Sequence, residues 1–336
     1  MTVQAPVQAS PKPPPFQIVR TEPSEKYLKV LLYGDYGAGK TTLAATALDV
    51  PQMNDVLFIN AESGDLSLPR GMDKVDVKSY ETLARVFEFL RAHVRYRDAG
   101  DTKRMADLEA RLRGEPVSTP KVYHTVIVDS LTEVQTYLMY QLLNLDIDNW
   151  ALDVTPESPE YKEWGQSSEM IQLLVRTFRD LPMHVIFVCS AQEVSDDRNR
   201  LLKRPNLPGK LAGKVQGFLD VVGYLDTAPD KDGNVIRRLW MQPGTRLFQA
   251  KHRFRNHPDL KYIDNPTMDQ LFNLTKESKT NASSTAAPSS NDTADAPAPS
   301  SSGSTARAGA PGGRTAGRPV QRGGRPVQSV RPVRGG

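Results

Sequence analysis

The stretch Gly34-Asp35-Tyr36-Gly37-Ala38-Gly39-Lys40-Thr41 fits the P-loop pattern G-x-x-x-x-G-K-[ST] at every fixed position. Glycines let the backbone of such a loop curl, so that successive N–H groups point inward at phosphate oxygens. In this pattern Lys40 reaches the β- and γ-phosphates, and the hydroxyl of Thr41 coordinates Mg²⁺. We therefore expect this stretch, together with Thr42, to bind the phosphates of a nucleotide.

The segments on either side supply the strand and the helix that the motif requires. The apolar run from Tyr27 to Tyr33 predicts a buried strand before the loop, and the spacing of Thr41 to Leu48 is compatible with a helix after it. Because strand, loop and helix follow in this order, a chance glycine-rich turn is the weaker interpretation.

Composition divides the 336 residues into three parts. Residues 1–25 are rich in proline, and residues 275–336 are rich in Ser, Thr, Ala and Pro and then in Gly and Arg. Neither end has the large apolar side chains that would offset the entropy cost of ordering. We expect a flexible N-terminal arm, one folded core at 26–274 and a disordered basic tail.

The positive charge of the chain is concentrated in that tail. The formal net charge is +4, and residues 281–336 contain seven arginines with no acid after Asp295. Two copies of Gly-Arg-Pro-Val-Gln, at 317–321 and 324–328, favour a mobile tether that can bind phosphates or an acidic protein tail. A single-stranded-DNA-binding protein is one candidate partner, and a linker without a ligand is the alternative.

Cysteine and hydropathy patterns point to a reducing compartment. The single cysteine, Cys189, excludes an intrachain disulfide and lies in an apolar run. The chain has no run of about 18 apolar residues and no signal-peptide core, which predicts a cytoplasmic protein without a membrane partner.

Apolar runs that predict strands alternate with segments of helical spacing through the core. Strands are expected at 55–60, 75–77, 123–130, 184–190, 219–225 and 238–242, and helices at 79–96, 101–113, 131–145 and 164–180. This alternation predicts an α/β fold with a mostly parallel twisted sheet and helices on both faces. The basic stretch 195–213 is expected to be a long loop.

Two acidic residues are candidates for the chemistry at the γ-phosphate. Asp129 closes an apolar strand, a position from which a carboxylate can hold Mg²⁺ opposite Thr41, although capping of the next helix is an alternative. Ser130 follows it, where AAA+ ATPases usually carry a glutamate as the water-activating base. Glu62, at the end of the second strand and expected beside the P-loop strand, is the candidate replacement, and a surface glutamate is the alternative.

Several segments resemble the RecA-type core of P-loop NTPases. Phe58–Glu62 resembles the segment that presents the catalytic glutamate, Val126–Ser130 resembles the Walker B strand, and Val185–Val188 with Ser190 and Gln192 resembles the sensor strand. Trp164-Gly165, Pro208–Gly213 and Ala250–Arg253 add a resemblance to the RecA-like branch of the phage-encoded Sak single-strand annealing proteins, over about residues 27–265.

This resemblance implies an ATPase that uses ATP and Mg²⁺ in the cytoplasm of a bacterial host. It implies that Gln192 or Ser190 senses the γ-phosphate, and that Lys251 and Arg253 reach the nucleotide of a neighbouring subunit. Alternation along a strand would place Lys251 and Arg253 on one face, as joint contact with a phosphate requires. The active protein would then be a homo-oligomer, either a ring or a filament; a solvated basic strand is the alternative.

In RecA-like proteins the stretch after the sensor strand lines the path of the DNA. Here it carries six basic candidates for nucleic-acid contact: Arg198, Arg200, Lys203, Arg204, Lys210 and Lys214. Phosphate contacts from them would be independent of DNA sequence and sensitive to salt. An ordinary solvated loop is the alternative, because no aromatic residue is interleaved for base stacking.

These features favour an ATPase that binds single-stranded DNA and promotes annealing or strand pairing in phage recombination. A helicase-type or helicase-loading motor on the same core is the second hypothesis. A nucleotide-binding scaffold with little turnover is the third. A GTPase is disfavoured because the chain lacks an Asn-Lys-x-Asp segment.

Overall fold

The computed structural model describes residues 27–145, 158–195, 199–243 and 248–276. The predicted N-terminal arm at 1–25, nearly all of the predicted tail and the predicted DNA contact Arg198 lie outside these residues. Among the helices of the described part, none is long and apolar enough to cross a membrane.

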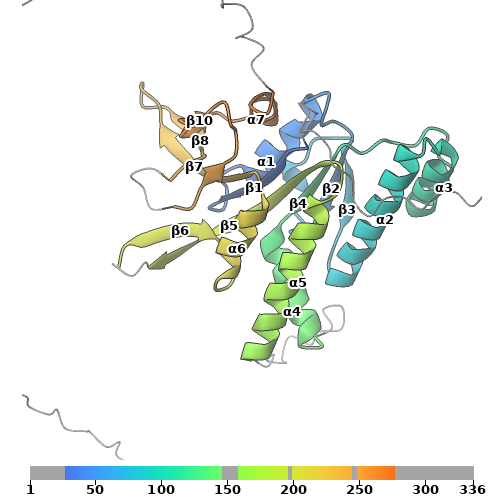
Figure 1. Ribbon diagram of the computed structural model, residues 1–336, viewed down its shortest axis with the longest axis horizontal. Helices are drawn as coiled ribbons and strands as arrows, with labels where there is room; N and C mark the ends of the chain where they lie inside the picture. Colours follow the sequence, from blue (N-terminus) through green and yellow to red (C-terminus); the bar gives the residue numbers. More distant parts are fainter. Residues whose placement is uncertain (1–26, 146–157, 196–198, 244–247, 277–336) are drawn as a thin grey trace, which may run out of the picture. The chain divides into compact units, whose positions relative to one another are not determined.

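The described strands form one ten-stranded sheet, in the order β10-β8-β7-β1-β5-β4-β2-β3 with β6 and β9 attached to it (Figure 1). Strands β7, β1, β5, β4, β2 and β3 are parallel, whereas β8, β10, β6 and β9 pair in the antiparallel sense. The strands are β1 (Lys29–Gly34), β2 (Val56–Asn60), β3 (Asp73–Asp76), β4 (Thr125–Asp129), β5 (His184–Ser195), β6 (Leu201–Pro205), β7 (Val221–Pro229), β8 (Val235–Trp240), β9 (Lys251–His252) and β10 (Tyr262–Asp264).

Helices cover both faces of this sheet, so the central strands are buried on both sides. The helices are α1 (Lys40–Ala45), α2 (Tyr80–Asp98), α3 (Thr102–Arg113), α4 (Leu131–Leu142), α5 (Tyr161–Arg179), α6 (Leu211–Phe218) and α7 (Met268–Asn273), with short 3₁₀ turns η1 (Thr46–Asp49) and η2 (Asp65–Ser67). Side chains of α2, α4, α5 and α6 share one apolar cluster with Leu31 and Tyr33 of β1. Side chains of α1 and α7 share the other with Val30 and Leu32.

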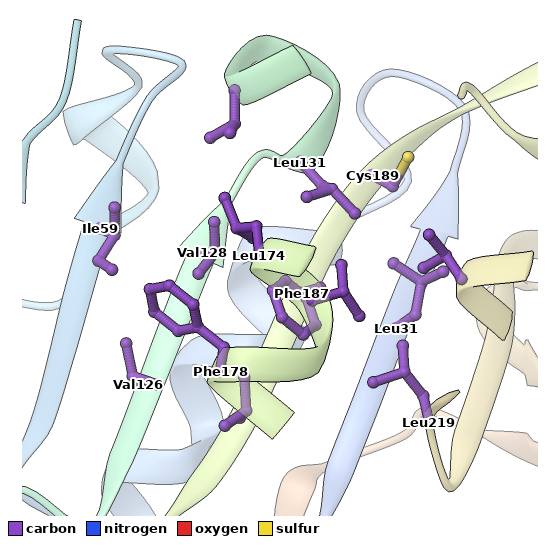
Figure 2. Packing of buried hydrophobic residues seen from close by; sticks show 14 of the residues in the cluster. Leu31, Ile59, Val126, Val128, Leu131, Leu174, Phe178, Phe187, Cys189 and Leu219 are labelled. Carbon is purple, nitrogen blue, oxygen red and sulfur yellow. The ribbon is translucent and has the colours of Figure 1, made fainter. Parts of the chain in front are cut away.

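Figure 2 shows the first cluster, where α5 packs on the sheet. Leu174 and Phe178 of α5 lie over Val126 and Val128 of β4 and Phe187 of β5. All five side chains are at most 5 % exposed. This packing fixes the relative positions of β4 and β5, whose carboxyl ends carry candidate site residues.

The predicted α/β fold, a mostly parallel sheet with helices on both faces, is confirmed. The prediction of a long loop at 195–213 is wrong. Residues 201–205 form β6, which pairs with the extended end of β5 as an antiparallel hairpin, and α6 begins at Leu211. Leu211, Ala212 and Val215 are buried under α5, so this helix belongs to the core.

Candidate nucleotide-binding site

The predicted P-loop joins β1 to α1 at the carboxyl edge of the parallel strands. Gly37 and Gly39 have φ angles of 76° and 91°, in the left-handed region that glycine adopts without strain. The backbone N–H of Ala38 donates to the carbonyl oxygen of Asp35 at 3.3 Å. Gly37 and Gly39 therefore lie where the backbone of the loop turns.

Lys40 lies inside this loop, only 8 % exposed. Its Nζ donates to the carbonyl oxygens of Gly34 at 3.1 Å and Asp35 at 3.0 Å. Tyr36, at the outer side of the loop, is 83 % exposed, and its ring centroid lies 5.9 Å from Lys40 Nζ. The ammonium is thus held at the loop itself, where phosphate oxygens can replace the carbonyl oxygens as acceptors.

Thr41 and Asp129 meet although they are far apart in the sequence. Thr41 Oγ1 donates to Asp129 Oδ2 at 2.5 Å, across β5, which separates β1 from β4 in the sheet. Asp129 is 3 % exposed, and burial raises its pKa to about 6, although the hydrogen bond from Thr41 opposes this shift.

The second carboxylate oxygen of Asp129 supports a magnesium site at this point. Oδ1 is buried and has no hydrogen-bond partner among the described residues. A buried carboxylate oxygen without a partner is costly, and a hard divalent cation is a ligand that would satisfy it. With the hydroxyl of Thr41 beside it, the chemistry of the donor set fits Mg²⁺ bound to nucleotide phosphates.

Replacing Asp129 by asparagine tests this site. The amide oxygen of asparagine can still accept the Thr41 hydrogen bond, but the charge that attracts Mg²⁺ is lost. We expect added Mg²⁺ to increase the ATP affinity of the native protein at least tenfold, the scale of a charge-assisted contact. For Asp129→Asn, added Mg²⁺ should increase the ATP affinity less than twofold. Calorimetric titrations with and without Mg²⁺ would measure the difference. An unchanged Mg²⁺ effect would contradict the assignment of Asp129.

The prediction that the strand before Glu62 lies beside the P-loop strand is wrong, because β5 and β4 lie between β1 and β2. The backbone of Glu62 instead lies beside Asp129, because β2 pairs with β4. The backbone N–H groups of Ala61 and Glu62 both donate to the carbonyl oxygen of Asp129, at 2.6 and 3.3 Å. Glu62 itself is exposed. Glu62 is therefore solvent-accessible and its backbone lies beside Asp129; its role as the base stays a prediction.

The structure also brings Glu133, in the first turn of α4, to this site. Burial raises the pKa of Glu133, and the negative charge of Glu62 adds to the shift. Sequence analysis missed Glu133 as a site residue. The sequence feature that could have drawn attention to Glu133 is the spacing Ser130-x-x-Glu133, which is typical of a helix start. Ser130 caps α4 by accepting a hydrogen bond from the backbone N–H of Glu133 at 3.3 Å.

The two predicted sensor residues have different surroundings. The Ser190 hydroxyl lies 3.1 Å from Thr132 Oγ1 of α4, one turn after Asp129, and accepts from Asn206 Nδ2 at 3.2 Å. Gln192 Nε2 donates to the carbonyl oxygens of Pro205 and Leu207, at 3.2 and 3.0 Å. Ser190 is thus linked to the helix that starts at the candidate metal site, whereas Gln192 is linked to the end of β6.

Lys251 and Arg253 do not lie with the P-loop of their own subunit. β9 pairs with the amino end of β7, through Val222, whereas Gly34 of the P-loop aligns with Leu225, nearer the carboxyl end. Strand β9 ends at His252, so Arg253 follows it and the predicted strand alternation does not reach this residue. Burial and the charge of Arg253 lower the pKa of Lys251, which places the two cations near each other.

Arg253 has local partners in this structure. Its Nη2 donates to the carbonyl oxygen of Gly217 at 2.8 Å, and its Nη1 lies 3.4 Å from Asp220 Oδ1. The side chain is nevertheless about half exposed, so it is accessible to another molecule at this surface.

The basic residues predicted for DNA contact are divided between the β5–β6 hairpin and α6. Lys203 of β6 is ion-paired with Asp35 of the P-loop, at 2.5 Å between Nζ and Oδ2, and this bond raises the pKa of Lys203. Lys210 and Lys214, at the start of α6, are exposed and four residues apart, so they share one helix face. Arg200 is exposed near the hairpin turn, and Arg204 is half-buried with its Nε in the interior.

Comparisons with known proteins identify the family of the chain. Residues 26–254 match the family model described as AAA domain. A search of curated proteins finds no match. Similar solved structures include the flagellar accessory protein FlaH from Methanocaldococcus jannaschii (11% identity, 70% of this chain and 83% of that chain, TM-score 0.31) and a KaiC-like protein from Pyrococcus horikoshii OT3 (14%, 66% and 83%, 0.28). The RadB recombinase is a third (16%, 68% and 84%, 0.29). Likenesses this distant do not distinguish one P-loop protein from another.

Proposed function

Because the chain belongs to the AAA domain family and its P-loop faces Asp129 and Glu62, we propose that it is an ATPase that binds single-stranded DNA. Its role would be ATP-dependent annealing or strand pairing in phage homologous recombination, in the bacterial cytoplasm and as a homo-oligomer. The observation that favours a DNA-binding ATPase over a plain nucleotide-binding protein is the ion pair between Lys203 of the basic hairpin and Asp35 of the P-loop.

In the proposed reaction the chain's own residues position ATP and a water molecule. Lys40 leaves its carbonyl acceptors and neutralises the β- and γ-phosphates. Thr41 and Asp129 would hold Mg²⁺, which supplies further charge neutralisation when bound. Glu62 orients and polarises the attacking water in line with the γ-phosphate.

Two contacts connect the nucleotide loop with the hairpin. The first is the Lys203–Asp35 ion pair. The second comes from Tyr33, directly before the P-loop, whose hydroxyl lies 3.3 Å from the carbonyl oxygen of Lys203. The same hydroxyl donates to the carbonyl oxygen of Gln249, before β9, at 2.5 Å. A phosphate that displaces Asp35 would change the charge around Lys203, so ATP binding and the surface of the hairpin would be coupled.

Removing the exposed charges of α6 tests the proposed DNA surface. The double variant Lys210→Ala/Lys214→Ala should bind a poly-dT oligonucleotide more weakly at low salt. The slope of log K against log salt should fall by about 0.7 for each lost phosphate contact. Fluorescence anisotropy over a salt series would measure both quantities.

The matched control is Lys103→Ala/Arg111→Ala, which removes two exposed charges from α3. Equal weakening in both double variants would mean that only the overall charge matters, and would contradict a DNA surface on α6.

ATP turnover with and without single-stranded DNA decides among the three functional hypotheses. A recombinase or annealing protein should hydrolyse ATP faster with DNA and should not unwind a forked duplex. A helicase-type motor would unwind the fork, and a helicase loader would stimulate unwinding by a partner. A scaffold with little turnover would show no stimulation by DNA.

A further inference from the structure

An arginine outside the P-loop motif lies directly against the P-loop. Arg237 of β8 pairs with Thr227 across the β7–β8 hairpin. A Cβ atom built on Gly39 would lie 2.6 Å from Arg237 Nε and 2.8 Å from Cζ, so the guanidinium contacts the loop at the residue before Lys40. Any side chain at position 39 would collide with it, in addition to the strain at a φ of 91°.

The neighbouring Arg238, in contrast, is held by contacts with other side chains. Arg238 forms two hydrogen bonds with Asp264, at 2.5 and 2.8 Å, and its Cζ lies 4.1 Å from the centroid of the Tyr262 ring. Arg237 points to the other face, is exposed, and has no hydrogen bond or ion pair from its guanidinium to any described residue. Only its backbone is held, by Asn265, whose N–H donates to the Arg237 carbonyl oxygen at 2.7 Å.

The sheet order determines which end of a nucleotide Arg237 faces. β5, β4 and β2 lie on one side of β1 and bring Asp129 and Glu62 to the γ-phosphate end. β7 and β8 lie on the opposite side of β1 and bring Arg237. Since the P-loop wraps around the middle of the phosphate chain, the two ends of the nucleotide leave it in opposite directions. With this sheet order, the γ-phosphate of a bound nucleotide would point toward Asp129, and its α-phosphate and nucleoside would point toward β7 and β8.

We infer that Arg237 is a nucleotide-binding residue that contacts the α-phosphate from the β7–β8 hairpin of the same subunit. The inference rests on the proposed nucleotide site. The guanidinium has no partner in the part of the chain that the structure describes and lies against a phosphate-binding loop, so it is suited to charge-assisted hydrogen bonds with phosphate oxygens. Because ADP and ATP share the α-phosphate, Arg237 contributes to the affinity for both and does not discriminate between them.

Titration calorimetry with Mg²⁺–ADP and Mg²⁺–ATPγS tests this assignment in the full-length chain. Arg237→Ala should weaken the binding of both nucleotides by the same factor, about tenfold, and Arg237→Lys should lose less, as expected for a charge-assisted phosphate contact. The control is Lys231→Ala, an exposed charge at the turn of the same hairpin.

The other outcomes separate this inference from the proposed function. If the native protein binds neither nucleotide, the proposed function fails. If the native protein binds both and Arg237→Ala binds them equally well or more tightly, Arg237 only covers the loop and the inference is wrong. A loss confined to ATPγS would place the guanidinium at the γ-phosphate, and a loss that differs between ADP and GDP would place it on the base; either result overturns the inference. An unchanged melting temperature without nucleotide confirms that the variant is folded.

Discussion

Replacing Glu62 by glutamine is expected to lower the rate of ATP hydrolysis at least a hundredfold, within the range of about 10² to 10⁴ that general-base catalysis contributes. The glutamine keeps the size and polarity of the side chain but cannot accept a proton from the attacking water. ATP binding should be nearly unchanged, because in the proposed site Lys40, Thr41 and Asp129 would make the contacts with the phosphates and the metal. Single-turnover hydrolysis and calorimetric ATP binding, measured on the same preparation, separate the two effects.

Glu133 supplies the comparison that this prediction needs. It is a second acidic residue close enough to Glu62 to be affected by its charge, and burial together with that charge raises its pKa. Glu133→Gln should lower the rate of ATP hydrolysis by less than about tenfold, because it removes a positioning contact and leaves the base in place. If Glu133→Gln is the slower enzyme and Glu62→Gln keeps its rate, the base lies on α4 and not at the end of β2.

Local patterns were sufficient to predict the centre of the site. The P-loop glycines, the apolar strands and Asp129 at a strand end are features of short segments, and parallel pairing brings the carboxyl ends of such strands to one edge. The order of the strands could not be predicted in this way: β2 was expected beside β1, whereas it pairs with β4 and brings the backbone of Glu62 to the Asp129 carbonyl oxygen.

Contacts made by pairing of distant segments could not be predicted in this way. The β5–β6 hairpin was interpreted as a loop because its basic residues and its proline resemble a solvated stretch, whereas the extended end of β5 gives them a partner strand. Arg237 is 198 positions from Gly39 in the sequence, and nothing in the pattern of β8 distinguishes it from Arg238. Only the order of the strands places one arginine over the P-loop and the other on Asp264.

Replacing Arg253 by alanine is expected to lower ATP turnover at least a hundredfold if this residue acts as an arginine finger. An arginine finger contributes a factor of about 10³ to 10⁵ to the rate of hydrolysis. Its own P-loop lies toward the other end of β7, so a contact with a γ-phosphate must be made in a neighbouring subunit. Arg255→Ala, which removes an exposed charge two residues further on, should keep nearly the native rate. Steady-state hydrolysis at saturating ATP, with melting temperatures to confirm folding, measures both.

Mixing two inactive variants distinguishes a finger in a neighbouring subunit from one that acts within its own chain. Lys40→Ala lacks the P-loop lysine but keeps Arg253, and Arg253→Ala has the opposite defect. In a random equimolar oligomer, about one quarter of the sites combine an intact P-loop with an intact finger from the adjacent chain, because such head-to-tail interfaces draw on two different subunits. The mixture should therefore recover up to about that share of native turnover. If Arg253 acted on its own P-loop, or only held Gly217 and Asp220 in place, no combination would restore a complete site and the mixture would stay inactive.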